Sequence, residues 1–374
     1  MADAVEILNH GVSLLQIADP QRALAAFDEA LRLDPQLAAA YYNRGVAAQQ
    51  LGRHDAALAD YNQALRIAPK DAEALVGRGL ARAAQGDYDA AIRDYTSAID
   101  LQPGQVKALG NRGNAYQTQG QNQAAIADYG AVLRLAPQDE KAYYNRGRIH
   151  YLQGDFEKAI GDFSDAIRLA AGFANAYHNR GLAYFRLGQW EQSLNDQSEA
   201  VRLDPSAAAY CDRGALYSRR GLLDLALADY SRAIRLDPTL AEAYYNRGVV
   251  LGLLGKLAEA LGDYSKNIEL HPENAKAYCH RGVVLVRQGQ FPAAIDDFGH
   301  AIQLDAGYAR AYCNRGLVYT ALGDLDIAIA DFDQAIRLSP DYARAYYHRG
   351  RALERKGDHN RAQSDLARAK QLSR

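Results

Sequence analysis

Hydrophobic and polar positions recur along the chain with a period of about 34 residues, and a glycine marks the same place in each period. In one period, the residues four before, at and three after this reference glycine are Tyr143, Gly147 and His150. They share one face of a helix at i, i+4 and i+7. In another period, an apolar stripe that includes Ala91 and Tyr95 follows the reference glycine by 12 to 20 residues. The pattern therefore predicts two amphipathic helices in every period.

The reference glycines set the register of the array. They are spaced by 34 residues, except for one step of 33, at Gly11, Gly45, Gly79, Gly113, Gly147, Gly181, Gly214, Gly248, Gly282, Gly316 and Gly350. A second glycine follows seven residues later in every unit but the first, and it tolerates the left-handed backbone of a turn between the two helices. We therefore divide residues 4–374 into eleven units of one solenoid domain: 4–37, 38–71, 72–105, 106–139, 140–173, 174–206, 207–240, 241–274, 275–308, 309–342 and 343–374.

One unit carries the motif of a known family. Residues 40–45 (Ala-Tyr-Tyr-Asn-Arg-Gly), followed by Gly52, Ala57, Tyr61 and Pro69, resemble the tetratricopeptide repeat (TPR), and similar segments recur from residue 4 to residue 374. The resemblance implies an all-α fold, a right-handed α-solenoid superhelix of eleven TPR helix–turn–helix repeats. It also implies an inner, concave wall lined by the first helix of each repeat, and a scaffold role in protein–protein interaction.

Composition and charge narrow the function further. The chain is 48% hydrophobic and 24% charged, and its net charge of −2 argues against a nucleic-acid partner held by bulk charge. The first residues do not form a secretion signal, and the longest apolar stretch, residues 249–255, is far shorter than the roughly 20 residues of a membrane helix. Three cysteines cannot form a disulfide framework. We therefore expect a cytoplasmic protein with no nucleic-acid partner and no membrane span.

An arginine directly precedes the reference glycine in ten units, at a position where TPR motifs usually carry leucine. An aspartate follows the glycine by 15 residues in the same ten units, from Asp60 to Asp365, whereas the first unit has His10 and Ala26 instead. Burying an unpaired guanidinium costs several kcal/mol. We therefore predict an arginine–aspartate pair inside each unit, and pairing between neighbouring units is the alternative.

Asparagine recurs two residues before the reference glycine, on the face of the first helix that should line the groove. An amide donates and accepts hydrogen bonds, so a column of amides can hold an extended peptide backbone. This column resembles the asparagine ladder in the repeat superhelix of the O-linked N-acetylglucosamine transferase, although no glycosyltransferase domain is present. The alternative is that the asparagines bond only to one another or to nearby backbone. The candidates are Asn43, Asn111, Asn145, Asn179, Asn246 and Asn314, with Asn114 on the same face.

Basic residues cluster on the same face, six residues before the reference glycine or just after it. A cation in the first turn of a helix opposes the helix dipole, so helix stability does not explain them. Acidic side chains or the C-terminal carboxylate of a peptide are their natural ligands. A solvated face is the alternative, since Glu73 and Glu242 share the first offset. The candidates are Lys107, Lys141, Arg148, Lys276, Arg310 and Arg344.

The first and sixth units depart from the pattern. The first helix carries Val5, Leu8, Val12 and Leu15 on what should be the open inner face, and a second copy of the chain could cover this stripe. The sequence therefore gives an alternative function, a homo-oligomeric assembly protein. The sixth unit is one residue short and has Ser193 and Gln197 where other units have alanine and an aromatic residue, so we expect a local change of twist there.

The sequence shows no catalytic motif. It contains no hydrolase triad, phosphate-binding loop or helical His-Glu motif. Cys279, His280, Cys313 and His348 fall on neighbouring helices, but helices about 8–10 Å apart do not readily share a zinc ion with bonds of about 2.0–2.3 Å. We expect no metal, no cofactor and no enzyme activity. The sequence predicts a scaffold that binds a protein or peptide ligand, extended or acidic, in its concave groove.

Overall fold

The computed structural model describes residues 3–373, which form 22 α-helices in eleven consecutive pairs. The first helices of the pairs are α1 (Ala4–Gln16), α3 (Ala38–Gln50), α5 (Ala72–Ala84), α7 (Val106–Thr118), α9 (Glu140–Gln153), α11 (Ala174–Arg186), α13 (Ala207–Arg219), α15 (Ala241–Leu253), α17 (Ala275–Arg287), α19 (Ala309–Leu322) and α21 (Ala343–Lys356). The second helices are α2 (Pro20–Leu33), α4 (His54–Ile67), α6 (Tyr88–Leu101), α8 (Asn122–Leu135), α10 (Phe156–Leu169), α12 (Trp190–Leu203), α14 (Leu223–Leu236), α16 (Leu257–Leu270), α18 (Phe291–Leu304), α20 (Leu325–Leu338) and α22 (His359–Leu372). The predicted all-α array of helix–turn–helix repeats is confirmed.

A short turn joins the two helices of each pair. Its glycine adopts a left-handed backbone, with φ of +71° at Gly52 and +85° at Gly154. A residue with a Cβ adopts this region only at a cost. The first repeat nevertheless has Ala18 at this place, with φ of +59°. The turn predicted for the second glycine is therefore confirmed.

The reference glycine lets the two helices of a repeat approach closely. A Cβ built on Gly79 would lie 2.6 Å from Cε1 of Tyr95, and one on Gly248 would lie 2.9 Å from Cε1 of Tyr264. The aromatic ring of the second helix therefore packs directly on the backbone of the first helix. Tyr95 and Tyr264 are buried as a result.

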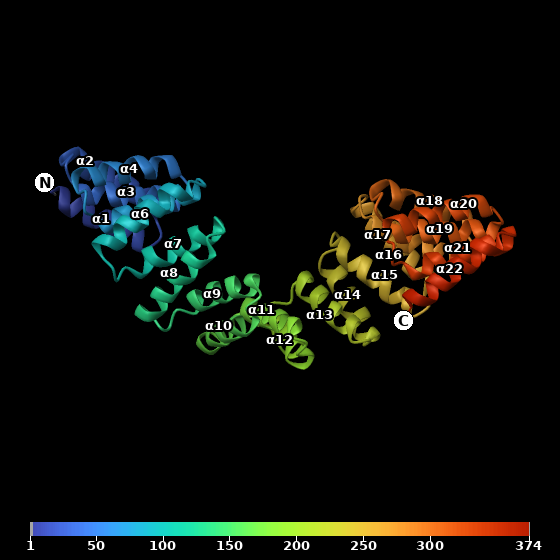
Figure 1. The fold of residues 1–374 in the computed structure, drawn as a ribbon. Helices are drawn as coiled ribbons and strands as arrows, with labels where there is room; N and C mark the ends of the chain where they lie inside the picture. Colours follow the sequence, from blue (N-terminus) through green and yellow to red (C-terminus); the bar gives the residue numbers. More distant parts are fainter. Residues whose placement is uncertain (1–2, 374) are drawn as a thin grey trace. The chain divides into compact units, whose positions relative to one another are not determined.

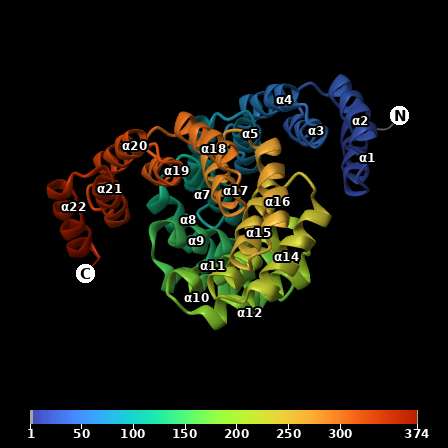
Figure 2. The same ribbon diagram turned by 90° about the vertical axis from the view of Figure 1, so that its right-hand side faces the viewer.

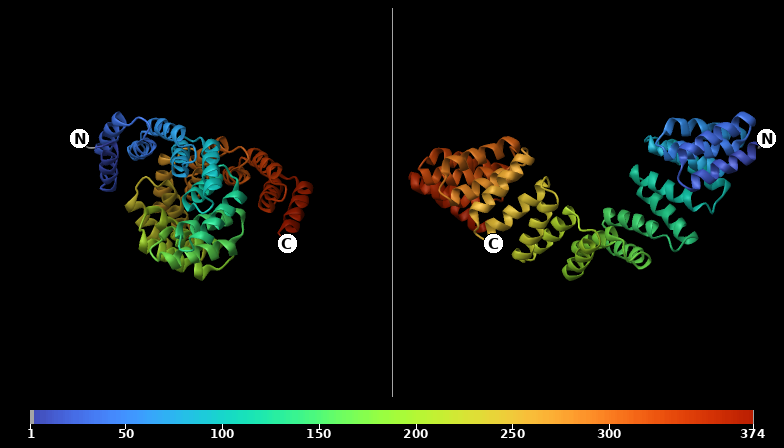
Figure 3. Two further views of the ribbon diagram at one scale, coloured as in Figure 1. Left: turned by 90° about the vertical axis from the view of Figure 1, so that its left-hand side faces the viewer. Right: turned by 180° about the vertical axis from the view of Figure 1, so that it is seen from behind.

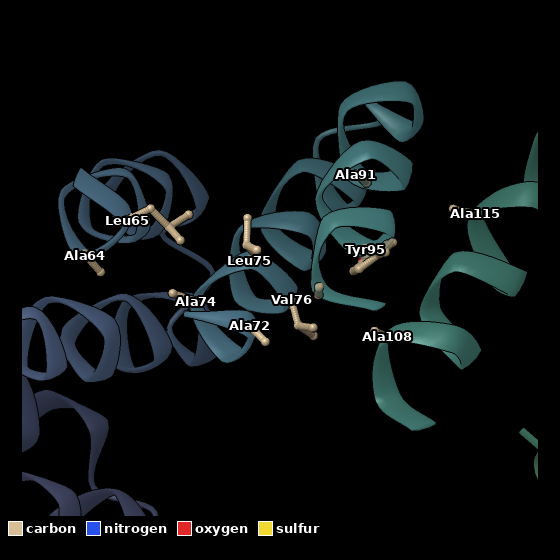
Figure 4. Packing of buried hydrophobic residues seen from close by; sticks show 11 residues of the cluster. Ala64, Leu65, Ala72, Ala74, Leu75, Val76, Ala91, Tyr95, Ala108 and Ala115 are labelled. Atoms are coloured by element: carbon tan, nitrogen blue, oxygen red, sulfur yellow. The ribbon is translucent and has the colours of Figure 1, made fainter. Parts of the chain in front are cut away.

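Neighbouring repeats share a core of small and branched side chains. Between α4 and α5, Leu65 packs with Ala74 and Leu75, and the same cluster continues through Tyr95 to Ala108 of α7 (Figure 4). Alanine leaves room for the facing helix, so the second helix of one repeat lies against the first helix of the next.

The chain divides into two compact units between Asp196 and Gln197, within α12. In the first unit, the five helix pairs from α1 to α10 are stacked one after the other and are followed by α11 (Figures 1 and 2). In the second unit, the helix pairs from α13 to α22 are stacked in the same way (Figure 3). None of the helices formed by residues 3–373 has the length and apolar character needed to cross a membrane.

The apolar stripe of α1 is largely covered by the core of the chain itself. Leu8 is 8% exposed and belongs to the same buried cluster as Phe27 of α2. Val12 and Leu15 pack, partly buried, against this cluster, whereas Val5 is 51% exposed. The expectation that the whole stripe lies open is therefore wrong, because Leu8 takes part in the packing of α1 on its neighbours.

Candidate functional site

The first helices present a common face in each unit. It is formed by the residues six, three and two before the reference glycine and one, four and five after it, and we call it the first-helix face. The candidate asparagines and basic residues all fall at these offsets. Pockets between adjacent first helices are lined mainly by residues of the same offsets, in both units.

The predicted arginine–aspartate pairs hold the two helices of each repeat together. In all ten repeats that carry the pair, Nε and Nη2 of the arginine donate to the two carboxylate oxygens, at 2.6–3.0 Å. The aspartates are buried, and this bidentate geometry supplies the charge partner that burial demands. Pairing inside the repeat is therefore confirmed.

Most of these arginines also contact the preceding repeat. In Arg44, Nη1 donates to Asp28 of α2 at 2.7 Å, and in Arg112 it donates to Thr96 of α6 at 3.0 Å. The hydrogen bond to Asp128 raises the pKa of Arg112, so its guanidinium stays charged. One arginine therefore ties three helices, and the two pairings posed as alternatives are combined in a single side chain.

Several candidate asparagines also link adjacent first helices. In Asn179, Nδ2 donates to the Tyr144 hydroxyl at 3.1 Å. In Asn314, Nδ2 approaches Sγ of Cys279 at 3.6 Å. In both cases the acceptor lies three residues before the reference glycine of the preceding repeat, and the Nδ2 of Asn246 approaches Cys211 in the same way, at 3.9 Å. The column thus contributes to the stacking of the repeats.

Other asparagines bond within their own helix or to one another. Nδ2 of Asn43 donates to the carbonyl of Ala39 at 2.8 Å, within its own helix. Nδ2 of Asn145 donates to Oδ1 of Asn114 at 3.3 Å, and the same oxygen accepts from the Tyr129 hydroxyl at 2.6 Å. These bonds agree with the alternative posed from the sequence, in which the asparagines bond to one another or to nearby backbone. Each amide still has hydrogen-bonding capacity beyond one or two such bonds, so a role in ligand binding stays a prediction.

The six basic candidates are exposed on the first-helix face. The first unit contributes one group, and the second unit another; in order these are Lys107, Lys141 and Arg148, then Lys276, Arg310 and Arg344. None of the six appears in an ion pair among the described residues. Their charges are therefore available to an acidic ligand.

Two pockets occupy equivalent places on the first-helix face. The Gly77 pocket lies between α3 and α5 and is lined by residues that include Tyr42, Tyr61 and Gly77, with a volume of about 320 Å³. The His280 pocket lies between α15 and α17, is lined by residues that include Tyr264 and His280, and has a volume of about 190 Å³. Neither pocket was predicted from the sequence. Gly77 stands two residues before its reference glycine, where most repeats carry asparagine, and this change was the signal in the sequence that could have indicated the first pocket.

The cysteines are core residues of the second unit. Cys211, Cys279 and Cys313 are free thiols and are at most 4% exposed. Burial raises the pKa of Cys211 to about 12, so the thiol is neutral and unreactive at neutral pH. Within residues 3–373, no group of three or more histidine, cysteine, aspartate or glutamate side chains is placed to share a metal ion.

Comparison with protein families covers most of the chain. Models described as "Tetratricopeptide repeat" match residues 8–72, 111–172, 174–207, 241–274 and 343–374. A model described as "TPR repeat" matches residues 79–120, 214–255, 284–323 and 316–357. The chain belongs to the tetratricopeptide repeat family. Its fold is generally a non-catalytic scaffold for protein–protein interaction.

Several solved structures are similar. MamA is 30% identical, with a TM-score of 0.40, over 43% of this chain and 94% of that chain. YrrB, described as "a TPR protein with an unusual peptide-binding site", is 22% identical, with a TM-score of 0.44, over 49% of this chain and 95% of that chain. The APC/C hetero-tetramer Cut9–Hcn1 is 18% identical, with a TM-score of 0.50, over 99% of this chain and 81% of that chain. The search of curated proteins found no match.

Proposed function

We propose that the chain is a non-catalytic scaffold that binds extended or acidic peptide segments along its first-helix face. The observation that carries this proposal is the recurrence of a pocket at the same place in two different repeats. A peptide that crosses the first helices places a side chain in such a pocket. The amides beside the pocket then have capacity to bond the peptide backbone.

The charges of the face support an acidic ligand. Arg310 is exposed and lines the His280 pocket, where no acidic side chain is among the described lining residues. Exposed cations speed the encounter with an acidic segment and favour it over a basic one. That the asparagine column holds a peptide backbone, as its resemblance to the ladder of the O-linked N-acetylglucosamine transferase implies, stays a prediction.

A selection from a random peptide library, displayed on phage and panned on the purified protein, tests the proposal. Enriched sequences would be synthesised with a fluorophore, and their affinity measured by anisotropy for the wild type and for the variant with Asn111, Asn145 and Asn179 changed to alanine. Loss of three backbone hydrogen bonds is expected to weaken binding by about tenfold or more.

A matched control changes three asparagines of second helices, Asn122, Asn195 and Asn360, to alanine, and this variant is expected to bind as the wild type does. Circular dichroism shows whether both variants are folded. The proposal fails when no sequence is enriched, or when the two triple variants bind equally well.

Self-association through α1 stays a separate prediction. Leu8 belongs to the core, and Val5 is the most exposed residue of the stripe, so a second copy that covers the stripe should contact Val5. Sedimentation of the wild type and of Val5→Asp tests this alternative, and a monomer in both cases would exclude it.

A further inference from the structure

Two glycines flank the floor of the Gly77 pocket. The Tyr61 ring lies between Gly45 and Gly77, where a Cβ would come within 2.9 Å and 2.7 Å of its Cε1. The ring is held in place by its hydroxyl, which donates to Oε1 of Gln49 at 2.9 Å. With no side chain at Gly77, the space above the ring stays open.

The walls of the Gly77 pocket are apolar. They include Val46, Val76 and Leu80, and Leu80 is 37% exposed. The rings of Tyr42 and Tyr61 lie 6.0 Å apart with an interplanar angle of 49°, so a third ring can pack against them edge to face or with an offset. A volume of about 320 Å³ exceeds that of an apolar cavity of about 150 Å³ that holds benzene.

The rim of the Gly77 pocket carries no excess charge. Glu73 and Lys107 both line it and have opposite signs. Glu73 is held by Gln105, whose Nε2 donates to its Oε1 at 2.9 Å. The pocket is therefore suited to a neutral side chain.

The His280 pocket has the opposite character. Its corresponding space is filled by the His280 ring, which lies 5.8 Å from the ring of Tyr264. Arg310 stands at the repeat position of Lys107, and Lys276 at that of Glu73. Arg287 adds a third cation, and its Nη1 donates to the carbonyl of Gly252 at 3.1 Å across the two first helices. No acidic side chain is among the described residues that line this pocket.

The same cations also affect the pKa of His280. Burial, followed by the charges of Arg310 and Lys276, lowers the pKa of His280 to about 4. The ring is therefore neutral at neutral pH and does not itself attract an anion. The exposed cations around it do so, because guanidinium and ammonium groups form charge-assisted hydrogen bonds with a carboxylate.

We propose that the two pockets read different side chains of bound peptides: the Gly77 pocket takes an aromatic side chain, and the His280 pocket takes an acidic one. This inference rests on the proposed function, because it assigns a specificity to the same face. The residue two before the reference glycine, Gly77 or His280, sets the size of each pocket. The residue six before it, Glu73 in one repeat and Lys276 in the other, sets the charge around the pocket.

Methyl NMR of the full chain, labelled at valine and leucine, tests the inference. Val46, Val76 and Leu80 report on the Gly77 pocket, and Val249, Val283 and Val284 report on the His280 pocket. The probes are two capped tripeptides, glycine-phenylalanine-glycine and glycine-glutamate-glycine, at millimolar concentration. The phenylalanine probe is expected to shift the first set of methyl signals, and the glutamate probe the second set.

Variants assign the effect to the pockets. Gly77→Asn introduces the residue found at this offset in most repeats and is expected to abolish the response of the first set. Leu80→Gln is expected to weaken binding of the phenylalanine probe without crowding Tyr61. Leu338→Gln, at a residue with the same 37% exposure, is the control and is expected to leave this binding unchanged. Arg310→Gln is expected to lower the affinity for the glutamate probe about fivefold or more.

The outcomes separate this inference from the proposed function. The inference is overturned when both probes shift both sets of signals equally, or when neither probe shifts either set. When peptides from the library selection still bind the first-helix face in that case, the proposed function stands without the assigned specificity. When no peptide binds at all, both fail.

Discussion

At the scale of single residues, the arginine that precedes the reference glycine in ten repeats joins several helices. Its Nε and Nη2 donate to the aspartate of its own repeat. In most repeats its Nη1 also donates to a side chain of the preceding repeat, as in Arg112 with Asp128 and Thr96. Most arginines also stack on a tyrosine one turn earlier; the guanidinium carbon of Arg146 lies 5.7 Å from the centre of the Tyr143 ring. A leucine at this place could pack but could not make these bonds.

Removal of one partner of an arginine–aspartate pair is expected to lower stability more than removal of both partners. In Arg112→Met, the Asp128 carboxylate, whose side chain is 7% exposed, loses its counter-ion, which costs about 2–4 kcal/mol after allowance for partial exposure of the arginine. In the double variant Arg112→Met with Asp128→Leu, apolar packing replaces the pair, so the loss is expected to be smaller.

Native-state hydrogen exchange of the amides in α7 and α8 measures these changes locally, which suits a repeat protein that does not unfold in one step. Asp128→Leu alone completes the double-mutant cycle. Purely additive effects of the two substitutions would contradict the prediction.

At the scale of helices, the bonds between repeats vary along the chain. Asp28, Asn62 and Thr96 are acceptors for the arginine of the following repeat. The residue at the same place before Arg146 is Gly130, in the middle of α8, which offers no side-chain acceptor. A Cβ built on Gly130 would lie 3.9 Å from Nη1 of Arg146, so a side chain fits there without a clash.

Gly130→Asp is expected to stabilise the junction of α8 and α9. Replacement of a helical glycine contributes a few tenths of a kcal/mol, and the new ion pair with Arg146 adds about 0.2–1 kcal/mol. Hydrogen exchange of α8 and α9 measures the gain. Gly130→Ala is the control for helix propensity, and its gain should not depend on salt, whereas part of the gain from aspartate should disappear in concentrated salt. A gain from aspartate that is insensitive to salt would speak against the ion pair.

At the scale of the whole molecule, stability is shared between neighbouring repeats rather than held in one core. Each repeat contacts chiefly its neighbours in sequence, so the weakest repeat decides where the array separates first. The boundary between the two compact units falls in α12. There Gln197 replaces the aromatic residue and is fully buried, and Ser193, 1% exposed, replaces the alanine. A polar α12 contributes less apolar burial than the other second helices.

The chain is therefore expected to unfold in more than one step, with the sixth repeat among the first to unfold. Trp190 is the one tryptophan of the sequence and packs edge-on against Phe185 of the same repeat, with ring centres 4.9 Å apart. In a urea titration, tryptophan fluorescence should change before the helical circular dichroism signal. Gln197→Phe, which introduces the usual type of residue, should bring the two curves together. Coincident curves for the wild type would show that the sixth repeat is not a weak point.

Much of the fold followed from the sequence because the repeat is local. Period, turn glycines and apolar stripes determine where each helix begins and ends, and the bidentate pairs join residues only 16 apart in the chain. The candidate site was less predictable. Asn179 and Tyr144 are 35 residues apart, and their bond depends on how far one first helix is turned against the next.

The sequence by itself determined the eleven helix pairs and their register, and it favoured the pairing of arginine with aspartate within a repeat, since all of these depend on short-range spacing. Only the tertiary structure decided that the same arginine also bonds the preceding repeat, that Leu8 is covered, and that Gly77 opens a pocket above Tyr61. These features depend on the stacking of neighbouring repeats. Side-chain volume and helix approach set that stacking together, and neither can be read from one repeat alone.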